Sequence, residues 1–301
     1  MNRVVLALVF VVGLVAGLVA RAAPAAAETV RVGLFAPSAP FPTTAARVEL
    51  ATKLGDHLGK ALGGTGTGRN YARAGDFAAG VRRGDVSIAL VDAPYLAIAG
   101  GNYTVLATAV RGGATSQAWQ LVARGATQIG DLRGKRVLVP VVGGRESDFV
   151  LNVLLGGDLA KGHFGKIEAA PDTASALAAL GLGKADAAVV PAGVQLPGGT
   201  SVVLRLPSLS GPVLVAYGLS AAQRQTIVQA LASFSGDATI SGFRPTDADA
   251  VRALARRFSP PVKRGPHAVP AVRLVVGDLV EGRTFEIERT PVTELVAAPA
   301  R

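Results

Sequence analysis

The chain has 301 residues, of which 50% are hydrophobic and 5% aromatic, and its formal net charge is +10. This length and hydrophobic content suit one large or two modest domains with an ordinary apolar core. Lysine and arginine are scattered without a long basic block, and few aromatic rings are available to stack on bases, which argues against nucleic-acid binding. The absence of cysteine excludes a disulfide framework and a lipid-modified cysteine anchor.

The first 27 residues have the pattern of a secretory signal peptide. Arg3 precedes an apolar run from Val4 to Ala20, and a stretch of small residues follows up to Glu28. A positive start, an apolar centre and an A-x-A site are typical of exported proteins, so we expect cleavage after Ala27 and a periplasmic protein. Because the apolar run approaches the length that spans a bilayer, an uncleaved membrane-anchored form is the alternative.

The next part of the chain alternates between strand and helix patterns. The expected strands are 29–35, 70–72 and 87–91, and the expected helices are 43–62 and 76–83. Leucines at i, i+4 spacing place one apolar face on the first helix. They are Leu50, Leu54, Leu58 and Leu62. The glycine-rich stretch 63–68 predicts a flexible turn, and Asp76 is expected to cap the second helix.

Two pairs of strands are expected to carry the chain between two lobes. Strands 104–110 and 118–123 flank the turn 111–114 on the way out, and strands 201–206 and 213–217 lead back. Between them we expect further strands at 136–141, 166–169 and 187–190, a helix through Leu154, and a helix ending at Leu182 that Asp172 or Thr173 caps. Helix 221–234 follows, with Ile227, Val228, Leu231 and Phe234 as its apolar face. Two last strands, 272–276 and 284–289, predict a β-hairpin.

One short phrase occurs twice, at Gly84–Val91 and at Gly183–Val190. In each copy a helix ends at glycine, and a continuous apolar run after an aspartate predicts a buried parallel strand. Two such units indicate two α/β lobes with a cleft at the carboxyl ends of their strands, where open α/β sheets bind ligands. We expect a signal peptide over 1–27, a first lobe from 28–113 and 207–260, a second lobe over 114–206, and a C-terminal extension, 261–301.

The order of these phrases resembles the periplasmic solute-binding proteins of the phosphate, phosphite and phosphonate transporter group. The residues that carry the resemblance are Phe35–Pro42, Gly84–Tyr95, Ile129–Val137, Gly143–Phe149 and Gly183–Val190. The resemblance implies a two-lobed, type II periplasmic-binding-protein-like α/β fold with two hinge strands, to which this chain adds the C-terminal β-hairpin extension. It also implies an ATP-driven (ABC) transporter permease as the partner. Phosphonate-binding members often carry a Ser-Thr-Ser-like run where this chain has 145–148, in which Ser147 alone keeps a hydroxyl.

The start of the helix in the second lobe is a candidate anion site. Glycines before a helix N-terminus leave free amides and the helix dipole pointing at a ligand, and Arg145 can add a bidentate contact. Two alternatives stay open: the glycines only make the turn while Arg145 pairs with a neighbouring carboxylate, or Glu146 or Asp148 holds a cation. The candidate residues here are Gly143, Gly144, Arg145, Glu146, Ser147 and Asp148.

Other candidate ligand-binding residues follow the ends of expected strands or lie near the crossings. Ser38 can donate a hydrogen bond and Phe41 can cover an apolar part of the ligand. Asp92 either faces the ligand or caps the next helix, and Tyr95 either contacts the ligand or lies in the core. Trp119 either stacks on a ligand or packs in the core. Pro191 ends a strand, where backbone groups can reach the cleft.

The sequence contains no arrangement typical of catalysis. Its three histidines, His57, His163 and His267, lack metal-ligand spacing, and there is neither a G-x-S-x-G elbow nor a phosphate-binding loop. We therefore expect no enzyme, no catalytic residue, no metal and no cofactor. The sequence predicts an exported protein that captures a small anionic solute, of phosphonate or phosphate type, between two lobes for an ABC transporter. A sensing module for a membrane receptor kinase and a ligand-free interaction protein are the alternatives.

Overall fold

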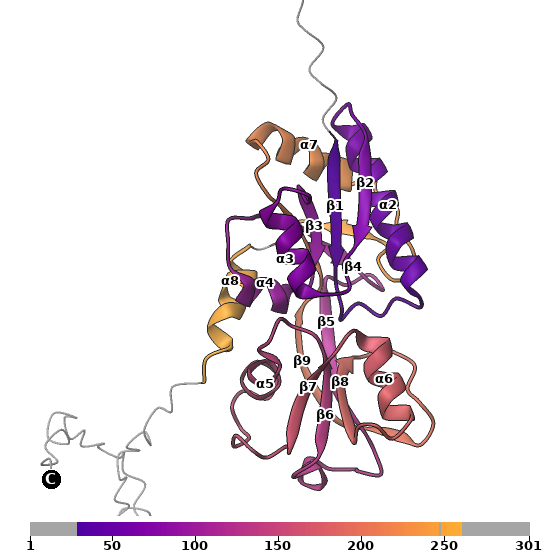
Figure 1. Cartoon of the computed structure of the whole chain (residues 1–301), viewed down its shortest axis with the longest axis vertical. Helices are drawn as coiled ribbons and strands as arrows, with labels where there is room; N and C mark the ends of the chain where they lie inside the picture. Colours follow the sequence, from indigo (N-terminus) through magenta and orange to yellow (C-terminus); the bar gives the residue numbers. More distant parts are fainter. Residues whose placement is uncertain (1–28, 247, 261–301) are drawn as a thin grey trace, which may run out of the picture. The chain divides into compact units, whose positions relative to one another are not determined.

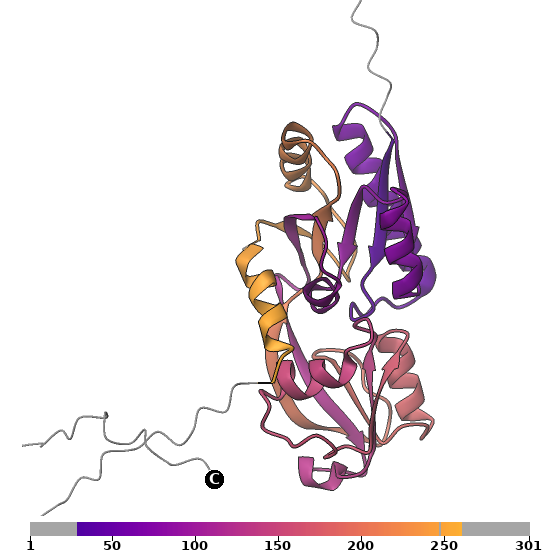
Figure 2. The ribbon, with the colours of Figure 1, turned by 60° about the vertical axis from the view of Figure 1, so that its left-hand side comes forward.

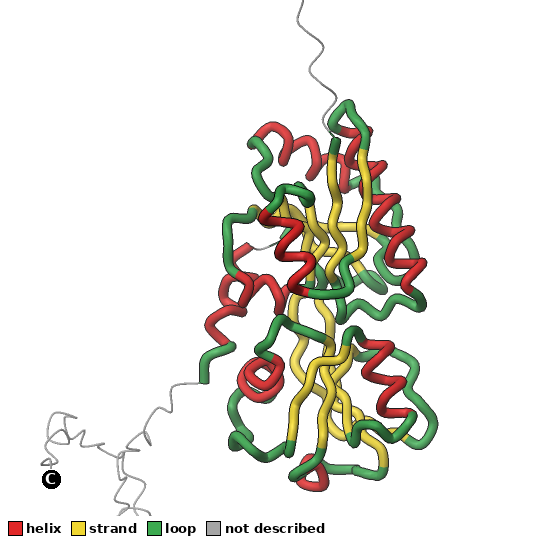
Figure 3. Tube along the Cα trace, in the orientation of Figure 1, coloured by secondary structure: helices red, strands yellow, loops and turns green. Residues whose placement is uncertain are grey.

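The computed structural model describes residues 29–246 and 248–260, which form two mixed β-sheets flanked by helices (Figures 1 and 3). The expected signal peptide and the expected C-terminal hairpin lie outside these residues. Within the described part of the chain, no helix is both long enough and apolar enough to cross a membrane.

The first sheet has six strands in the order β11-β4-β10-β3-β1-β2. Their bounds are β1 Val30–Phe35, β2 Gly66–Asn70, β3 Ile88–Val91, β4 Thr104–Val110, β10 Val213–Ala216 and β11 Gly242–Arg244. Strand β1 runs parallel to β2 and β3, whereas β10 runs antiparallel to β3 and β4. All four residues of β3 are buried, as a continuous apolar run predicts for a central strand.

The second sheet has five strands in the order β7-β6-β8-β5-β9. Their bounds are β5 Ser116–Arg124, β6 Arg136–Pro140, β7 Lys166–Ala170, β8 Ala187–Pro191 and β9 Thr200–Ser210. Strand β6 is parallel to β7 and β8, and β5 is antiparallel to β8 and β9. The chain changes sheet twice, between β4 and β5 and between β9 and β10, which is the two-lobed arrangement that the sequence predicts.

Helices cover both faces of each sheet (Figure 1). Their bounds are α2 Thr44–Ala61, α3 Ala74–Arg82, α4 Ala93–Ala99, the 3-10 helix η1 Ile129–Leu132, α5 Glu146–Asp148, the π-helix η2 Phe149–Leu154, α6 Thr173–Gly181, α7 Ala221–Leu231 and α8 Ala248–Arg257. In the first sheet, α2 and α7 share a core with β1, while residues of α3, α4 and α8 form a second core. In the second sheet, η2 and α6 contribute to separate cores.

The repeated Gly-x-x-Asp phrase forms the same helix end in both sheets. After α3, Gly84 has φ 75°, its N–H donates to Val81 O, and the next N–H donates to Gly80 O. After α6, Gly183 has φ 69°, with the equivalent bonds to Leu180 O and from Lys184 to Ala179 O. This paired pattern is a Schellman motif, and it needs glycine because the conformation is left-handed.

The turn predicted for 63–68 is confirmed only up to Thr65, because the rest of this glycine-rich stretch belongs to β2. The strand predicted at 70–72 therefore begins earlier, at Gly66, and ends at Asn70. A Cβ atom on Gly66 would overlap the carbonyl group of Gly55, and one on Gly68 would overlap that of Ala51. The backbones of α2 and β2 therefore pack directly against each other, which only glycine permits. The glycines serve close packing and not flexibility.

The helix predictions are confirmed in part. Leu50, Leu54 and Leu58 are buried on α2, and Asp172 caps α6 by accepting from Ser175 N at 2.8 Å. The prediction for Asp76 was wrong, because Arg73 is the N-cap of α3 and Asp76 lies in its first turn, where a carboxylate favours the helix dipole. Val228 was also wrongly assigned to the apolar face of α7, since it is 41% exposed.

Candidate ligand-binding site

The loop after β1 joins the first sheet to the start of α6 on the second. Thr173 N donates to Pro37 O at 3.1 Å, and Thr173 Oγ1 donates to Ser38 O at 2.8 Å. Arg47 of α2, which is 7% exposed, pairs with Asp172 at 3.2 Å. Two hydrogen bonds and an ion pair therefore hold the two sheets together at the carboxyl ends of their strands.

Two predicted site residues, Ser38 and Asp92, form the inner layer of this contact. Ser38 N donates to Asp92 Oδ2 at 2.7 Å, and Gln117 Nε2 donates to Ser38 Oγ at 3.2 Å. Asp92 is the N-cap residue of α4 but makes no side-chain hydrogen bond to that helix. Because it is 2% exposed, burial raises the pKa of its carboxyl to about 6. Its Oδ1 atom has no hydrogen-bond partner among the described residues.

Phe41 is buried in the same contact. Its ring lies under the guanidinium of Arg47, with the Cζ atom 5.1 Å from the ring centroid. This cation–π contact orients Arg47 toward Asp172. Phe41 therefore supports the contact between the sheets and offers little surface to a ligand.

A separate groove of about 660 Å³ is lined by α3, α4 and the loop after β6. We call it the α3–α4 groove. Its lining residues are Ala74, Gly75, Phe77, Ala78, Val81, Arg82, Tyr95, Leu96, Ile98, Ala99, Gly100, Gly101, Asn102, Val141, Gly143, Gly144, Arg145 and Tyr217. The first sheet and its helices supply most of the wall, and the loop after β6 supplies the rest. Four predicted site residues, Tyr95, Gly143, Gly144 and Arg145, come together here.

The charge of the α3–α4 groove is positive, because two arginines and no Asp or Glu are among its lining residues. Arg82 is exposed, and its guanidinium makes no hydrogen bond or ion pair with the described residues. Arg145 pairs with Asp148 at 2.8 Å and donates to Phe258 O at 3.1 Å. Burial raises the pKa of the Tyr95 hydroxyl, and the positive charge of Arg82 opposes that rise, which indicates that the two groups interact. The hydroxyl of Tyr217 likewise has a raised pKa because of burial.

The loop 143–146 is shaped by its own residues. Gly143 and Gly144 have φ 100° and 94°, and a Cβ on Gly143 would lie 3.1 Å from the Tyr95 ring. Glycine therefore allows this left-handed loop to reach Tyr95. The carboxylate of Glu146 accepts from Val142 N at 3.0 Å and from Gly144 N at 3.1 Å. Glu146 thus stabilises the loop and occupies one amide that an anion would otherwise use.

The remaining predicted residues do not line the groove. Ser147 and Asp148 line a separate depression with Lys161 and Lys166. Trp119 is 2% exposed and packs edge-on against Phe149, with ring centroids 5.1 Å apart. Pro191 is buried in β8, where its carbonyl accepts from Gln120 Nε2 at 3.4 Å. Over residues 29–246 and 248–260, no group of three His, Asp or Glu side chains could hold a metal ion.

Arg82, Arg47 and Thr173 are the residues that sequence reasoning missed. Arg82 lies near the end of a correctly predicted helix, but its position on the groove depends on α4 packing beside α3. Arg47 and Thr173 matter because two segments about 125 residues apart meet, and one sequence carries no signal of that meeting.

No protein-family model matches the sequence, and no curated protein sequence matches it. Solved structures do match the fold. A protein from Xanthomonas citri bound to ATP has a TM-score of 0.61 and 14% identity, covering 76% of this chain and 96% of its own. A binding-protein component of an ABC phosphonate transporter from Pseudomonas aeruginosa has a TM-score of 0.60 and 14% identity, covering 77% and 87%. PhnD1 from Prochlorococcus marinus in complex with methylphosphonate has a TM-score of 0.60 and 12% identity, covering 76% and 96%.

The chain has the type II periplasmic-binding-protein fold. This confirms the predicted fold class, and the matched structures include the phosphonate-transporter group that the sequence resembles. At these identities the likeness concerns the fold, so the ligand has to be argued from the residues of the groove.

Proposed function

We propose that this chain is an exported solute-binding protein that captures a small anionic solute in the α3–α4 groove for an ABC transporter. One observation carries the proposal: the groove has no lining carboxylate and contains Arg82, which has no partner among the described residues. An unpaired arginine in a groove that a tyrosine also lines is a ready partner for a phosphonate, phosphate or carboxylate. The apolar walls from Phe77, Leu96 and Ile98 suit an organic part of the same solute.

The fold supports the same class of function. Among the structures of this fold, one holds methylphosphonate and one holds ATP, and both molecules carry phosphorus oxyanions. Because residues from both sheets border the groove, a bound solute would contact both sheets at once. Ligand that binds one arrangement of the sheets more tightly shifts the population toward it, and a transporter can recognise that arrangement. The proposed role requires a protein that works outside the cytoplasm, which is also what its N-terminal pattern predicts.

Isothermal titration of the purified protein with methylphosphonate and inorganic phosphate tests the proposal. Glutamate and spermidine serve as an amino-acid probe and a cationic probe. Arg82→Gln should weaken oxyanion binding roughly tenfold to a hundredfold, because it removes one charge-assisted contact. Arg133→Gln is the matched control, since Arg133 is exposed and lies outside the groove.

Two results would reject this function. If no oxyanion binds, the ligand-free interaction protein is the better interpretation. If spermidine binds and the oxyanions do not, the site recognises cations and the role given to Arg82 is wrong.

A further inference from the structure

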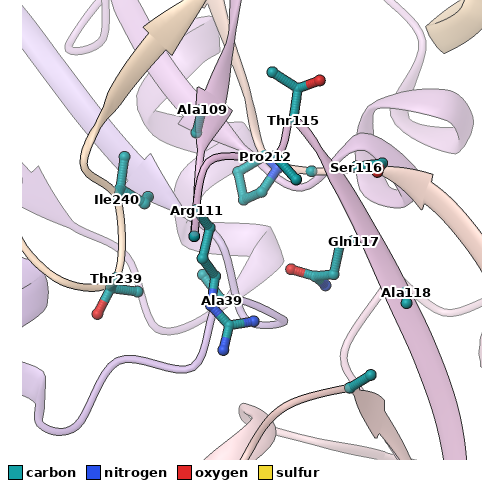
Figure 4. Close-up of a pocket in the computed structure, with 14 residues that line it drawn as sticks. Ala39, Ala109, Arg111, Thr115, Ser116, Gln117, Ala118, Pro212, Thr239 and Ile240 are labelled. Carbon is teal, nitrogen blue, oxygen red and sulfur yellow. The ribbon is translucent and has the colours of Figure 1, made fainter.

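A second, smaller pocket lies where the chain crosses between the sheets. Its volume is about 260 Å³, and Figure 4 shows the side chains around it. The lining residues are Ala39, Ala109, Arg111, Gly112, Ala114, Thr115, Ser116, Gln117, Ala118, Ala192, Gly211, Pro212, Thr239 and Ile240. We call it the crossing pocket. Both crossings, 111–115 and 211–212, form part of its wall, and it shares no lining residue with the α3–α4 groove.

A tight turn fixes the position of Arg111. Arg111 N donates to Ala114 O at 2.9 Å, and Ala114 N donates to Arg111 O at 3.0 Å. Gly112 and Gly113 between them have φ 55° and 81°. Two left-handed residues inside a reciprocal pair of bonds make a type I′ turn, for which Gly-Gly is a favoured sequence. The backbone at Arg111 is therefore held in place independently of its side chain.

The Arg111 side chain carries the only charge among the lining residues of the crossing pocket. In Figure 4 it extends into the space between Ala39 and Gln117. Its guanidinium makes no hydrogen bond or ion pair with the residues that the structure describes, although the side chain is half-buried. Burial lowers the pKa of this guanidinium, because no neighbouring anion compensates for the lost hydration.

The other polar groups of the pocket do not neutralise this charge. Gln117 is 8% exposed, and its Nε2 donates to Ser38, so its amide is held in a fixed direction. Thr239 and Ile240 also line the pocket, and the carboxylate closest to them in sequence is Asp237. Asp237 accepts hydrogen bonds from Thr239 N at 2.7 Å and from Ile240 N at 2.8 Å. The Asp237 carboxylate therefore accepts hydrogen bonds within its own loop and forms no ion pair with Arg111. Arg111 is the one charged residue among those that line the crossing pocket, and the polar residues around it are neutral.

We propose that the crossing pocket is a second anion-binding site, in which Arg111 holds a small inorganic oxyanion of phosphate size. A planar guanidinium binds two oxygens of such an ion at once, and partial burial strengthens that contact relative to water. The pocket has room for such an ion together with bound water, and its volume is well below that of the α3–α4 groove. Because Arg111 belongs to the first crossing, a bound oxyanion restrains its side chain at that crossing.

Phosphate titration followed by ¹H–¹⁵N NMR of the purified protein tests this site separately from the groove. We expect saturable shifts of the backbone amides at 111–118 and 239–240. Arg111→Gln should weaken this response roughly tenfold or more. Arg82→Gln, which alters the groove, should leave it unchanged. Amide shifts at Tyr95 and Gly143 report binding in the α3–α4 groove in the same spectra. The experiment can therefore show binding at one site and its absence at the other.

Arg111→Lys gives a second measurement if the glutamine variant does not fold. Lysine keeps the positive charge but lacks the planar guanidinium that contacts two oxygens at once, so phosphate should bind more weakly to this variant than to the wild type. The inference is overturned if phosphate leaves the amides at 111–118 unshifted in the wild-type protein. It is equally overturned if they respond with unchanged affinity in a folded Arg111 variant.

Discussion

The buried carboxyl of Asp92 predicts a specific pH dependence of stability. Its pKa lies near 6 in the folded protein, against 3.8 ordinarily, so the native state holds this proton more tightly than the unfolded state does. The free energy of unfolding therefore contains a contribution that is complete below about pH 4 and falls as the pH rises to about 6. A difference of about two pH units corresponds to about 3 kcal/mol, because each unit is worth ~1.36 kcal/mol.

Asp92→Asn isolates this contribution. Asparagine keeps an oxygen that can accept from Ser38 N, but it has no proton to exchange, so its stability should not fall over the same pH range. Urea unfolding at several pH values between about 4 and 7 measures the difference between variant and wild type. Asp85→Asn is the control, because Asp85 is exposed and its pair with Arg83 lies at the surface. Parallel curves for Asp92→Asn and the wild type would refute the reasoning.

Three further substitutions test the packing of the fold, each by urea unfolding. Gly68→Ala should cost about 1–3 kcal/mol or more, because its Cβ would overlap the α2 backbone; unchanged stability would mean that α2 and β2 separate easily. Phe258→Ala should cost about 3–5 kcal/mol, because this fully buried ring stacks on Phe149 of η2; a cost below about 1 kcal/mol would show that α8 is loosely held. Thr173→Val should cost about 1 kcal/mol, because Ser38 O loses its donor; Thr226→Val, on an exposed face of α7, is its control.

The sequence predicts the two-sheet fold well where the signal is local. A helix that ends at a left-handed glycine before an apolar strand needs only a few consecutive residues, so both copies of the Gly-x-x-Asp phrase were interpreted correctly. The same local reasoning failed at Gly66 and Gly68. Glycines that make a flexible turn and glycines that let a helix approach a strand look alike in the sequence, and only the packed partner distinguishes them.

The candidate site was predictable in place but not in detail. The loop that starts at Gly143 does reach the groove, because the carboxyl ends of parallel strands meet at one edge. The sequence did not predict that Arg82, and not Arg145, is the arginine of the groove without an ion-pair partner among the described residues. Whether an arginine is free to bind a ligand depends on which side chains pair with it. Such pairing depends on distances of a few ångström between segments that can lie far apart in the sequence.

Helix α8 shows how the groove is linked to the rest of the protein. Figure 2 shows this orange helix beside both sheets. Val251 packs in the core of α3 and α4, whereas Leu254 and Phe258 pack in that of the second sheet. Arg145 lines the groove and also donates to Phe258 O at 3.1 Å. The guanidinium of Arg145 therefore already has structural partners at the end of α8 and on Asp148.

This pairing leads to a comparison between the two arginines of the groove. Arg145 and Asp148 form a nearly neutral pair, so replacing both, as Arg145→Gln with Asp148→Asn, removes little net charge from the groove. We expect methylphosphonate affinity to change only a few-fold in this double variant, whereas Arg82→Gln weakens it roughly tenfold to a hundredfold. Titration calorimetry of the two variants measures both effects. An equally large loss in the double variant would show instead that Arg145 leaves Asp148 to bind the solute, as the anion-site hypothesis for 143–147 requires.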